Sequence, residues 1–450
     1  MKNYHPSDWG LQLLPLLALL AAGPAGAADV EPLSTIPTIA ETPVSVNPVP
    51  LTMMMAVEEA LSSNPDYAGM QARARAMQTV PAQAGALPDP MLTVGMMNLP
   101  TDTYDFDQEP MTQLQIGLSQ QFPFWGKRKL KKQAASAEAK AADASAVEAR
   151  LQTISDVKVT WWQLYYLKRA LEIVQRNQSL LRKFVDIAQT KYKVGSGLQQ
   201  DVLLAQVELS KLLDKEIQLT GLQQGVLARL NKLLNRPINQ PITLPEEVDT
   251  TLAEPLAEAD LVEHALTHRP LLEMYQRDLE AADSKLKLAK KGYYPDINLG
   301  VAYGYRQGVD PMGNERPDFA SMTLGINLPL YAGWKQGKQV DQQNEMLTKQ
   351  KYVLESGRQQ ILANLRQLLA EYRRSREQAQ LFLTGIVPQA RQTVSSMLAG
   401  YQVNKVDFLN LVRAQIILYD YETQYWKAVS EANEALAKLA ATAGKENLYE

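Results

Sequence analysis

The most constraining feature of the sequence is that it contains one pattern twice. Residues 56–65 read AVEEALSSNP, and residues 261–270 read LVEHALTHRP. At the same offset, residues 87–95 read LPDPMLTVG and residues 292–300 read GYYPDINLG. Self-similarity over this length predicts two copies of one supersecondary unit.

The N-terminal residues have the composition of a secretory signal peptide. Leu11 to Ala22 is largely apolar, and Ala25-Gly26-Ala27 fits the rule of small residues at a cleavage site, so we expect residues 1–27 to be removed. Residues 28–52 are rich in proline and are expected to form an extended arm. At the other end, residues 446–450 read ENLYE, which we interpret as the remnant of an engineered protease tag.

Composition narrows the class of protein. The chain has no cysteine, so we expect neither disulfides nor a lipid anchor on a cysteine. Its net charge is −3, so nothing indicates a nucleic-acid partner. Beyond the signal peptide, no run of about 18 apolar residues predicts a membrane-spanning helix.

Both copies, residues 53–250 and 251–445, have the same expected order of elements. A helix precedes two strands, and a long helical hairpin follows them. In the first copy the expected ranges are a helix at 55–86, strands at 91–98 and 111–122, and helices at 127–194 and 198–234. In the second copy they are a helix at 258–291, strands at 296–306 and 319–328, and helices at 337–400 and 405–442. The helix at 337–400 is expected to be weakened at Gly357, Gly385 and Pro388.

Three of the four expected strands alternate between apolar and polar or small residues. Leu114, Ile116 and Leu118, for example, alternate with glutamine, glycine and serine. This period of two over about ten residues is typical of a transmembrane β-barrel strand, with apolar side chains outward and polar ones inward. A half-buried strand of a soluble sheet has the same pattern, so periodicity alone leaves both interpretations open.

Three further observations favour transmembrane β-barrel strands over strands of a soluble sheet. Aromatic residues gather where strands meet helices, as at a membrane interface: Phe122, Phe124, Trp125, Tyr293, Tyr294, Tyr331 and Trp334. The signal peptide would let the chain reach an outer membrane. Finally, four strands cannot leave open edges in lipid, and the smallest bacterial barrels have about eight strands, so two or three subunits must complete the barrel.

The helices also predict an oligomer. From Lys127 to Val194 the sequence has no glycine or proline, and such a helix would measure roughly 100 Å. Apolar residues such as Leu151, Ile154 and Trp161 keep a seam at spacings of three and four. An ordinary antiparallel coiled coil is the simpler interpretation, but helices of this length need neighbours outside one compact domain.

These residues resemble the TolC-like outer-membrane efflux proteins over essentially all of the mature sequence. The resemblance rests on the repeat, on the junctions FPFWGK at 122–127 and LPLYAGWK at 328–335, and on two hairpin tips that begin at Tyr192 and Tyr401. The segments LPDP at 87–90, EPMTQ at 109–113 and FPFWGK at 122–127 look most like the heavy-metal branch, which exports copper and silver or cobalt, zinc and cadmium.

The resemblance implies a mixed α and β membrane protein in the outer membrane of a Gram-negative bacterium. Three copies would form a twelve-stranded β-barrel, four strands each, continued by a long periplasmic α-helical barrel. Partners would be a periplasmic adaptor and a proton-driven inner-membrane pump of the RND type. The implied docking and gate residues are Tyr192, Val194, Gly195, Ser196, Gly197, Asp201, Tyr401, Val403, Asn404, Lys405 and Asp407.

The two tips differ from one another. Asn404 stands where the first tip has Gly195, and asparagine adopts a left-handed turn less freely than glycine. Family members often place an acidic residue just past each tip. Asp201 fits this pattern, whereas the second copy has Asn410 there and Asp407 nearby. Asp201 is equally compatible with a solvated residue at a helix start.

The sequence contains no recognisable catalytic motif, so we expect neither an enzyme nor a cofactor. His264 and His268 have a spacing that can bind metal, but the first copy has Glu59 and Ser63 there, and we interpret the pair as a polar helix face. Methionine clusters such as Met53-Met54-Met55 and Met96-Met97 are interpreted as apolar packing and lipid-facing surface rather than soft-metal ligands.

The sequence therefore predicts a passive exit duct for heavy-metal ions or small toxic compounds. Two alternatives remain open: an outer-membrane channel of a protein secretion system, and a periplasmic coiled-coil scaffold without a barrel.

Overall fold

The computed structural model describes residues 50–403 and 405–449. The expected signal peptide, most of the N-terminal arm, Asn404 and Glu450 lie outside the described residues. Pro50 is also the residue at which the compact unit of the structure begins.

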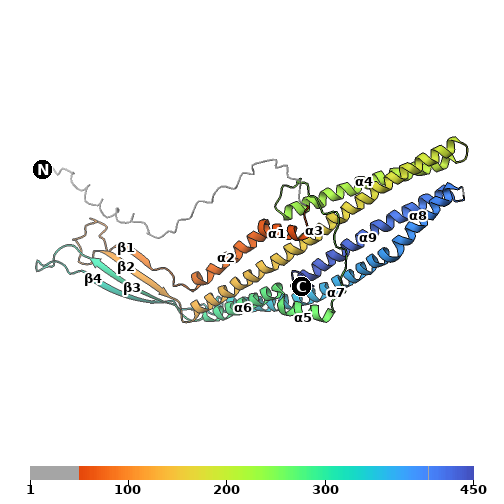
Figure 1. Ribbon diagram of the computed structural model, residues 1–450. Helices are drawn as coiled ribbons and strands as arrows, with labels where there is room; N and C mark the ends of the chain where they lie inside the picture. Colours follow the sequence, from red (N-terminus) through yellow and green to blue (C-terminus); the bar gives the residue numbers. More distant parts are fainter. Residues whose placement is uncertain (1–49, 404, 450) are drawn as a thin grey trace, which may run out of the picture. The chain divides into compact units, whose positions relative to one another are not determined.

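Four strands form one antiparallel sheet in the order β1-β2-β3-β4 (Figure 1). They are β1 (Met91–Met97), β2 (Gln113–Phe122), β3 (Ile297–Tyr305) and β4 (Phe319–Ile326). Their ends lie within two residues of the ranges expected from the sequence. The central pair β2 and β3 joins the two copies, and β1 and β4 form the two edges.

The strand register collects most of the large apolar residues of the four strands on one face. Leu92, Leu118, Val301 and Met322 pair in one row across the sheet. All four are exposed, Met322 by 78%. The next row points to the opposite face and consists of Met91, Ser119, Gly300 and Thr323. No residue of the four strands is charged.

The helix before each strand pair is broken, which corrects the single helices expected at 55–86 and 258–291. The structure has α1 (Met53–Ser63) and α2 (Pro65–Gly85), then α5 (Glu258–His268) and α6 (Pro270–Lys291). Asn64 and Arg269, the residues between them, are both extended. Each precedes a proline, whose ring disfavours a helical conformation in the residue before it.

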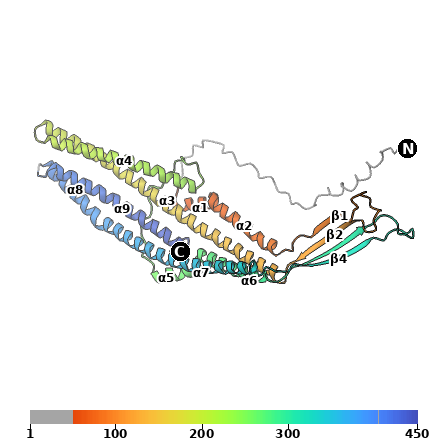
Figure 2. The ribbon, with the colours of Figure 1, turned by 180° about the vertical axis from the view of Figure 1, so that it is seen from behind.

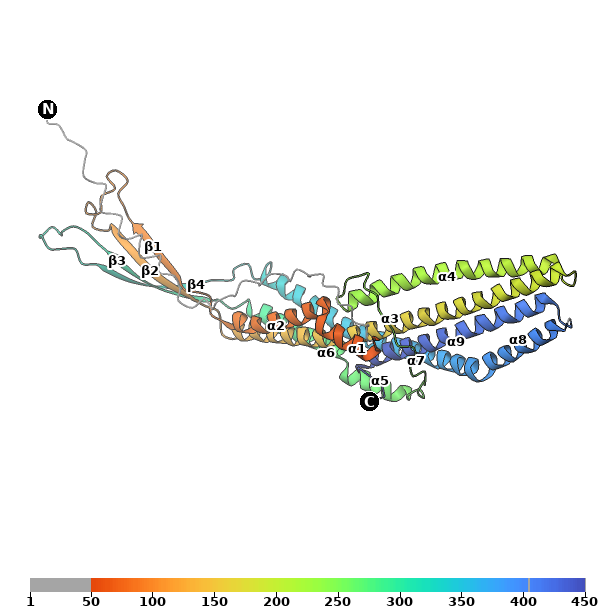
Figure 3. The same cartoon turned by 45° about the horizontal axis from the view of Figure 1, so that its top comes forward.

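The first copy continues into α3 (Lys127–Lys193), an uninterrupted helix of 67 residues, and returns through α4 (Gln199–Leu233). The second copy departs from the long helix expected at 337–400. It has α7 (Gln336–Leu381), a π-helix η2 (Phe382–Ile386), α8 (Val387–Gln402) and the returning α9 (Phe408–Ala443). Figure 3 shows the bend between α7 and α8. A π-helix and a nearby proline are recognised causes of bends.

The helices near the sheet form a layer that follows the strand order. α2 packs on α3, α3 on α6, and α6 on α7. Farther from the sheet, α3 packs on α4 and α9, and α9 on α8. Figures 1 and 2 show the two hairpins, α3 with α4 and α8 with α9, from opposite sides. The layer thus ends in α2 on one side and α7 on the other, as the sheet ends in β1 and β4.

The core is centred on α3. Trp161, which is 2% exposed, stacks on Tyr165 with ring centroids 5.4 Å apart, and both pack against Leu230 of α4. The indole N–H of Trp161 donates to the carbonyl of Leu51 at 3.0 Å. The start of the described chain is therefore fixed to the middle of α3.

The residue at each helix break also binds the end of the returning helix in its own copy. The Asn64 amide donates to the carbonyl of Leu233, and the Arg269 guanidinium donates to the carbonyl of Thr442. Arg269 additionally pairs with Glu148 of α3 at 2.9 Å, and both residues are buried. Because a buried charge is costly without a partner, this pair ties the second copy firmly to the first.

Residues 446–449, which belong to the segment interpreted as a tag remnant, contact the helices, and the interpretation of their origin stays a prediction. Leu448 is buried in the cluster formed by α5, α7 and α9. Glu446 pairs with Arg150 at 2.8 Å, and the Tyr449 hydroxyl donates to the carbonyl of Glu254. The apolar side chain of Leu448 and these polar contacts explain why the segment is ordered.

Among the described residues, none of the helices combines the length and the apolar character that crossing a membrane requires.

Candidate functional site

The first hairpin tip is a tight turn between α3 and α4. Gly195 has a φ of +75°, and the amide of Ser196 donates to the carbonyl of Lys191 at 2.8 Å. Together with the bond from Gly195 N–H to the carbonyl of Tyr192, this is a Schellman turn, which ends a helix through a left-handed glycine. A Cβ on Gly197 would lie 2.8 Å from the Cβ of Lys191, so glycine is needed there as well.

The second tip repeats part of this geometry. The amide of Lys405 donates to the carbonyl of Gly400 at 2.9 Å, which matches the bond between Ser196 and Lys191. Asp407 is extended and precedes α9, and its side chain makes no capping hydrogen bond. The expectation about Asn404 lies outside the described residues. Both tips present an apolar side chain to solvent, Val194 in the first and Val403 in the second.

A lysine connects the two tips. The ammonium of Lys191 donates to the carbonyl of Tyr401 at 3.0 Å and lies 4.0 Å from the centre of its ring. Tyr401 is only 6% exposed and packs on Phe408, with ring centroids 5.3 Å apart. A cation over an aromatic face is attracted by the ring quadrupole, so this contact couples α3 to the α8–α9 hairpin.

The expected acidic residues meet between the tips. Burial raises the pKa of Asp201, repulsion from Asp407 raises it further, and the charge of Lys191 and a backbone hydrogen bond at Leu198 oppose these effects. The structure therefore brings Asp201, Asp407 and Lys191 into one electrostatic cluster.

The expected aromatic residues lie where the strands meet α3 and α7. Phe124 and Tyr294 stack at 4.5 Å, and the ammonium of Lys291 lies over both rings. Six of the seven expected aromatic residues are exposed, most of all Trp334 at 87%: Phe122, Trp125, Tyr293, Tyr294, Tyr331 and Trp334. Exposed aromatic rings beside an apolar sheet face have the composition of a membrane-interface belt.

An ion pair that the sequence did not reveal holds this junction together. Lys127, the first residue of α3, contacts Asp296 at 2.7 Å, and Asp296 also accepts from the backbone amide of Phe124 at 2.7 Å. Lys127 and Asp296 belong to different copies. In the sequence, Lys127 is the last residue of the motif FPFWGK, which follows β2, and Asp296 directly precedes β3. No pattern in the sequence links the two residues.

Comparison with known families identifies the chain. The family model of the outer membrane efflux proteins (OEP) matches residues 56–236 and matches again over residues 261–445. The chain belongs to the outer membrane efflux protein family. The double match places one family unit on each half of the chain, and the known relatives are channel proteins rather than enzymes.

Individual members of the family are only distantly similar in sequence. The alkaline protease secretion protein AprF of Pseudomonas aeruginosa is 22% identical over 281 residues, which is 61% of this chain and 57% of that protein. The chain spans about half the length of the curated relatives that it matches.

Solved structures share the fold. The outer membrane protein VceC of Vibrio cholerae has a TM-score of 0.73 at 21% identity, covering 87% of this chain and 96% of that one. CusC, solved in a study of transmembrane channel formation, has a TM-score of 0.75 at 15% identity, covering 88% and 93%. The family likeness therefore includes both the sheet and the long helices.

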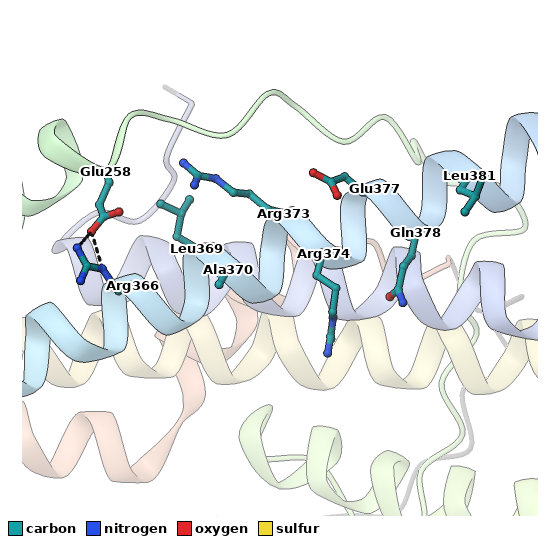
Figure 4. Close-up of a pocket in the computed structure, with 9 residues that line it drawn as sticks. All are labelled: Glu258, Arg366, Leu369, Ala370, Arg373, Arg374, Glu377, Gln378 and Leu381. Atoms are coloured by element: carbon teal, nitrogen blue, oxygen red, sulfur yellow. Dashed lines mark hydrogen bonds and ion pairs between the residues drawn. The ribbon is translucent and has the colours of Figure 1, made fainter.

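The structure also contains a groove that sequence analysis missed. It has a volume of about 640 Å³ and runs along α7 beside Glu258. Figure 4 shows its side chains, which come almost entirely from one helix. Arg366 pairs with Glu258 at 2.9 Å and Arg374 with Glu431 at 3.1 Å. Two of the three arginines that line the groove are therefore paired with carboxylates.

His264 and His268 lie next to each other on α5, with ring centroids 4.7 Å apart. Within residues 50–403 and 405–449, no cluster of three or more His, Cys, Asp or Glu side chains is arranged to hold a metal ion.

Proposed function

We propose that the chain is one third of an exit duct in the outer membrane of a Gram-negative bacterium. The observation that carries this proposal is the sheet, which has an exposed apolar face, an uncharged opposite face and, within the described part of the chain, no partner strand at either edge. An apolar surface of this size is unfavourable in water, and open strand edges are unfavourable in lipid. Closure with other copies removes both problems.

The edges of the sheet and of the helix layer fit such a closure. β1 and α2 lie on one side, and β4 and α7 lie on the other. Pairing β4 and α7 of one copy with β1 and α2 of the next would extend both layers around a ring. Three copies give twelve strands, as the resemblance to TolC-like proteins implies, and the internal repeat makes the ring nearly sixfold.

Transport through this duct is passive. Its wall at the sheet carries hydroxyl and amide groups, for example on Ser119, Gln121 and Asn298, and no charge that would hold an ion. A conduit conducts only when cargo leaves as easily as it enters. We therefore assign the energy source to a proton-driven inner-membrane pump and the coupling to a periplasmic adaptor that docks on the tips.

We assign the gate to the tips and the cargo to heavy-metal ions. The gate assignment is supported by the contact between Lys191 and Tyr401, which must change if the hairpins separate. The cargo assignment rests on the LPDP and FPFWGK segments. Protein secretion is the second candidate, favoured by the similarity to AprF.

A pair of survival and secretion assays separates these cargoes. We expect deletion of the gene to sensitise cells to copper, silver, cobalt, zinc or cadmium when the cognate pump is present, and to leave the secreted proteins unchanged. Normal metal tolerance together with the loss of a secreted protein would favour the secretion channel. Absence of a detergent-extracted trimer would favour the scaffold.

Substitutions at the tips test the gate. Gly195→Val forces a branched residue into a left-handed conformation at a cost of roughly 1–2 kcal/mol. We expect it, and Lys405→Glu in the second tip, to abolish metal resistance while the trimer still forms. Gly221→Ala is the control, since the position of its Cβ in α4 is open space. Unchanged resistance in the Gly195 and Lys405 variants would remove the gate from the tips.

A further inference from the structure

The histidine pair on α5 has a more specific geometry than a polar helix face requires. Leu261 and Ala265 bury one side of α5, and His264 and His268 lie beside that side on successive turns. Their rings are nearly parallel, with an interplanar angle of 27° and centroids 4.7 Å apart. Histidines four residues apart on a helix can bind one metal ion together if both present a free ring nitrogen to it.

The hydrogen bond of His264 assigns its tautomer. Nδ1 lies 2.8 Å from the carbonyl oxygen of Ala443, the last residue of α9. A carbonyl oxygen can only accept, so Nδ1 must carry the proton in this contact. The lone pair of the neutral ring then resides on Nε2.

The contact of His268 fits the same tautomer. Its Nδ1 lies 2.6 Å from the hydroxyl of Thr267. That hydroxyl also lies 2.8 Å from the carbonyl of Glu263, and when it donates its proton there it accepts the Nδ1 proton of His268. The lone pair of His268 is then also on Nε2, and neither Nε2 atom has a hydrogen-bond partner among the described residues.

We propose that the Nε2 atoms of His264 and His268 bind one divalent transition-metal ion such as Ni²⁺, Cu²⁺ or Zn²⁺. Imidazole nitrogen is a preferred ligand of these ions. Metal-binding histidines commonly donate their other ring N–H to a carbonyl or a similar acceptor, which is the role that Ala443 and Thr267 fill here. Water completes the coordination, so the ion exchanges readily.

The site is independent of the exported cargo, because it lies on α5 rather than on the sheet or the tips. Its position gives it a structural consequence. His264 contacts the end of α9, and the adjacent Arg269 binds Thr442, with its charge balanced by Glu148. A bound ion fixes both imidazoles and stabilises the contact between α5 and α9, whatever passes through the duct.

Metal binding to the full-length, untagged protein tests the proposal. We expect retention on immobilised Ni²⁺ and one Cu²⁺ per protomer, with an electron paramagnetic resonance spectrum that shows two nitrogen ligands. His268→Ala is the decisive variant, since it leaves the bond between His264 and Ala443 intact. It should weaken Cu²⁺ binding by more than about tenfold, because even outer-shell partners of such histidines contribute 10–100-fold.

A matched variant completes the experiment. Thr267→Val keeps the shape of the side chain but removes the acceptor for His268, so we expect intermediate affinity. His5 lies in the expected signal peptide, so His264 and His268 are the histidines of the expected mature chain and binding reports on them. Binding by His268→Ala at the affinity of the unmodified protein, or no binding by the unmodified protein, would overturn the proposal.

Discussion

At the scale of single residues, opposing electrostatic effects act on the carboxyl group of Asp201 at the hairpin tips. Asp201 sits in the first turn of α4, where the helix dipole ordinarily favours a negative charge. Burial and the proximity of Asp407 outweigh that preference and raise the pKa of Asp201. Because Lys191 also contacts Tyr401, the same ammonium group interacts with both hairpins, with Asp201 in the first and Tyr401 in the second. The tips are therefore stabilised when Asp201 is protonated.

The sign of this effect gives a pH prediction. A carboxyl whose pKa is higher in the folded tip contributes stability below the ordinary aspartate value of about 3.9, and that stability is lost as pH rises through the raised pKa. We expect Asp201→Asn to imitate the protonated state, so that the tips open less often at neutral pH. Hydrogen exchange of residues 185–205, corrected for intrinsic rates, measures this.

Asp186→Asn on the exposed side of α3 is the control for charge alone. It should leave exchange at the tip unchanged. Faster exchange in Asp201→Asn than in the unmodified protein at neutral pH would contradict the assignment of Asp201 to the cluster.

At the scale of elements, the returning helices of the two copies end in the same way, whereas the long helices that precede them differ. α4 ends at a left-handed Asn235 and α9 at a left-handed Gly444. In both copies the next amide bonds back to the helix, from Arg236 to Asn231 and from Lys445 to Ala440. By contrast, α3 is continuous, whereas η2 interrupts the helix of the second copy. The bend therefore belongs to one hairpin only.

Deletion of Gly385 tests the importance of the bend. A π-helix contains one residue more than the α-helix around it, so removing one residue takes out the π-turn and keeps the faces of α7 and α8 in register. Pro388 stays in place and still interrupts the hydrogen bonds of the helix, so the bend is reduced rather than removed. We expect reduced export, measured as metal resistance.

The matched control is deletion of Gln175 from α3. This helix has no extra residue, so the deletion rotates every later side chain and exposes Leu181 and Phe184. We expect a lower melting temperature and no stable trimer. Full export by the Gly385 deletion would mean that the bend has no role in transport.

The strand faces were predictable from the sequence, whereas the connections between helices were not. Period-two alternation is local, so Leu118 and Met322 could be placed on one face from their own neighbours. The link from Lys191 to Tyr401 joins residues 210 positions apart, and no local pattern indicates it. Asn64 and Arg269 each precede a proline in the sequence, but the helical pattern on both sides of each residue favoured one continuous helix. The glycine and proline of 385 and 388 marked a weak point without predicting a π-helix.

At the scale of the whole molecule, the open edges predict how copies meet. The chain contains no cysteine, so introduced cysteines form no unwanted disulfides. We expect Thr93→Cys in β1 to crosslink with a cysteine at one of positions 321, 323 or 325 in β4 and to give a covalent trimer on a denaturing gel. Crosslinked dimers as the largest product would contradict twelve strands.

A pair within one chain is the control. Gly117 and Ala302 are direct partners in β2 and β3, and a Cβ on Gly117 would lie 3.4 Å from that of Ala302. Cysteines at these two positions should form a disulfide inside the chain and leave the covalent product at the size of a monomer.

The unpaired edges of β1 and β4 also determine how the channel is made. An isolated chain presents two rows of unsatisfied backbone groups and a bare apolar face, which is a template for aggregation. On the proposed trimer, no stable intermediate separates folding of the sheet from association. The rate of channel formation therefore depends on chain concentration to a power above one. We also expect newly exported chains to need a chaperone until they associate with other copies.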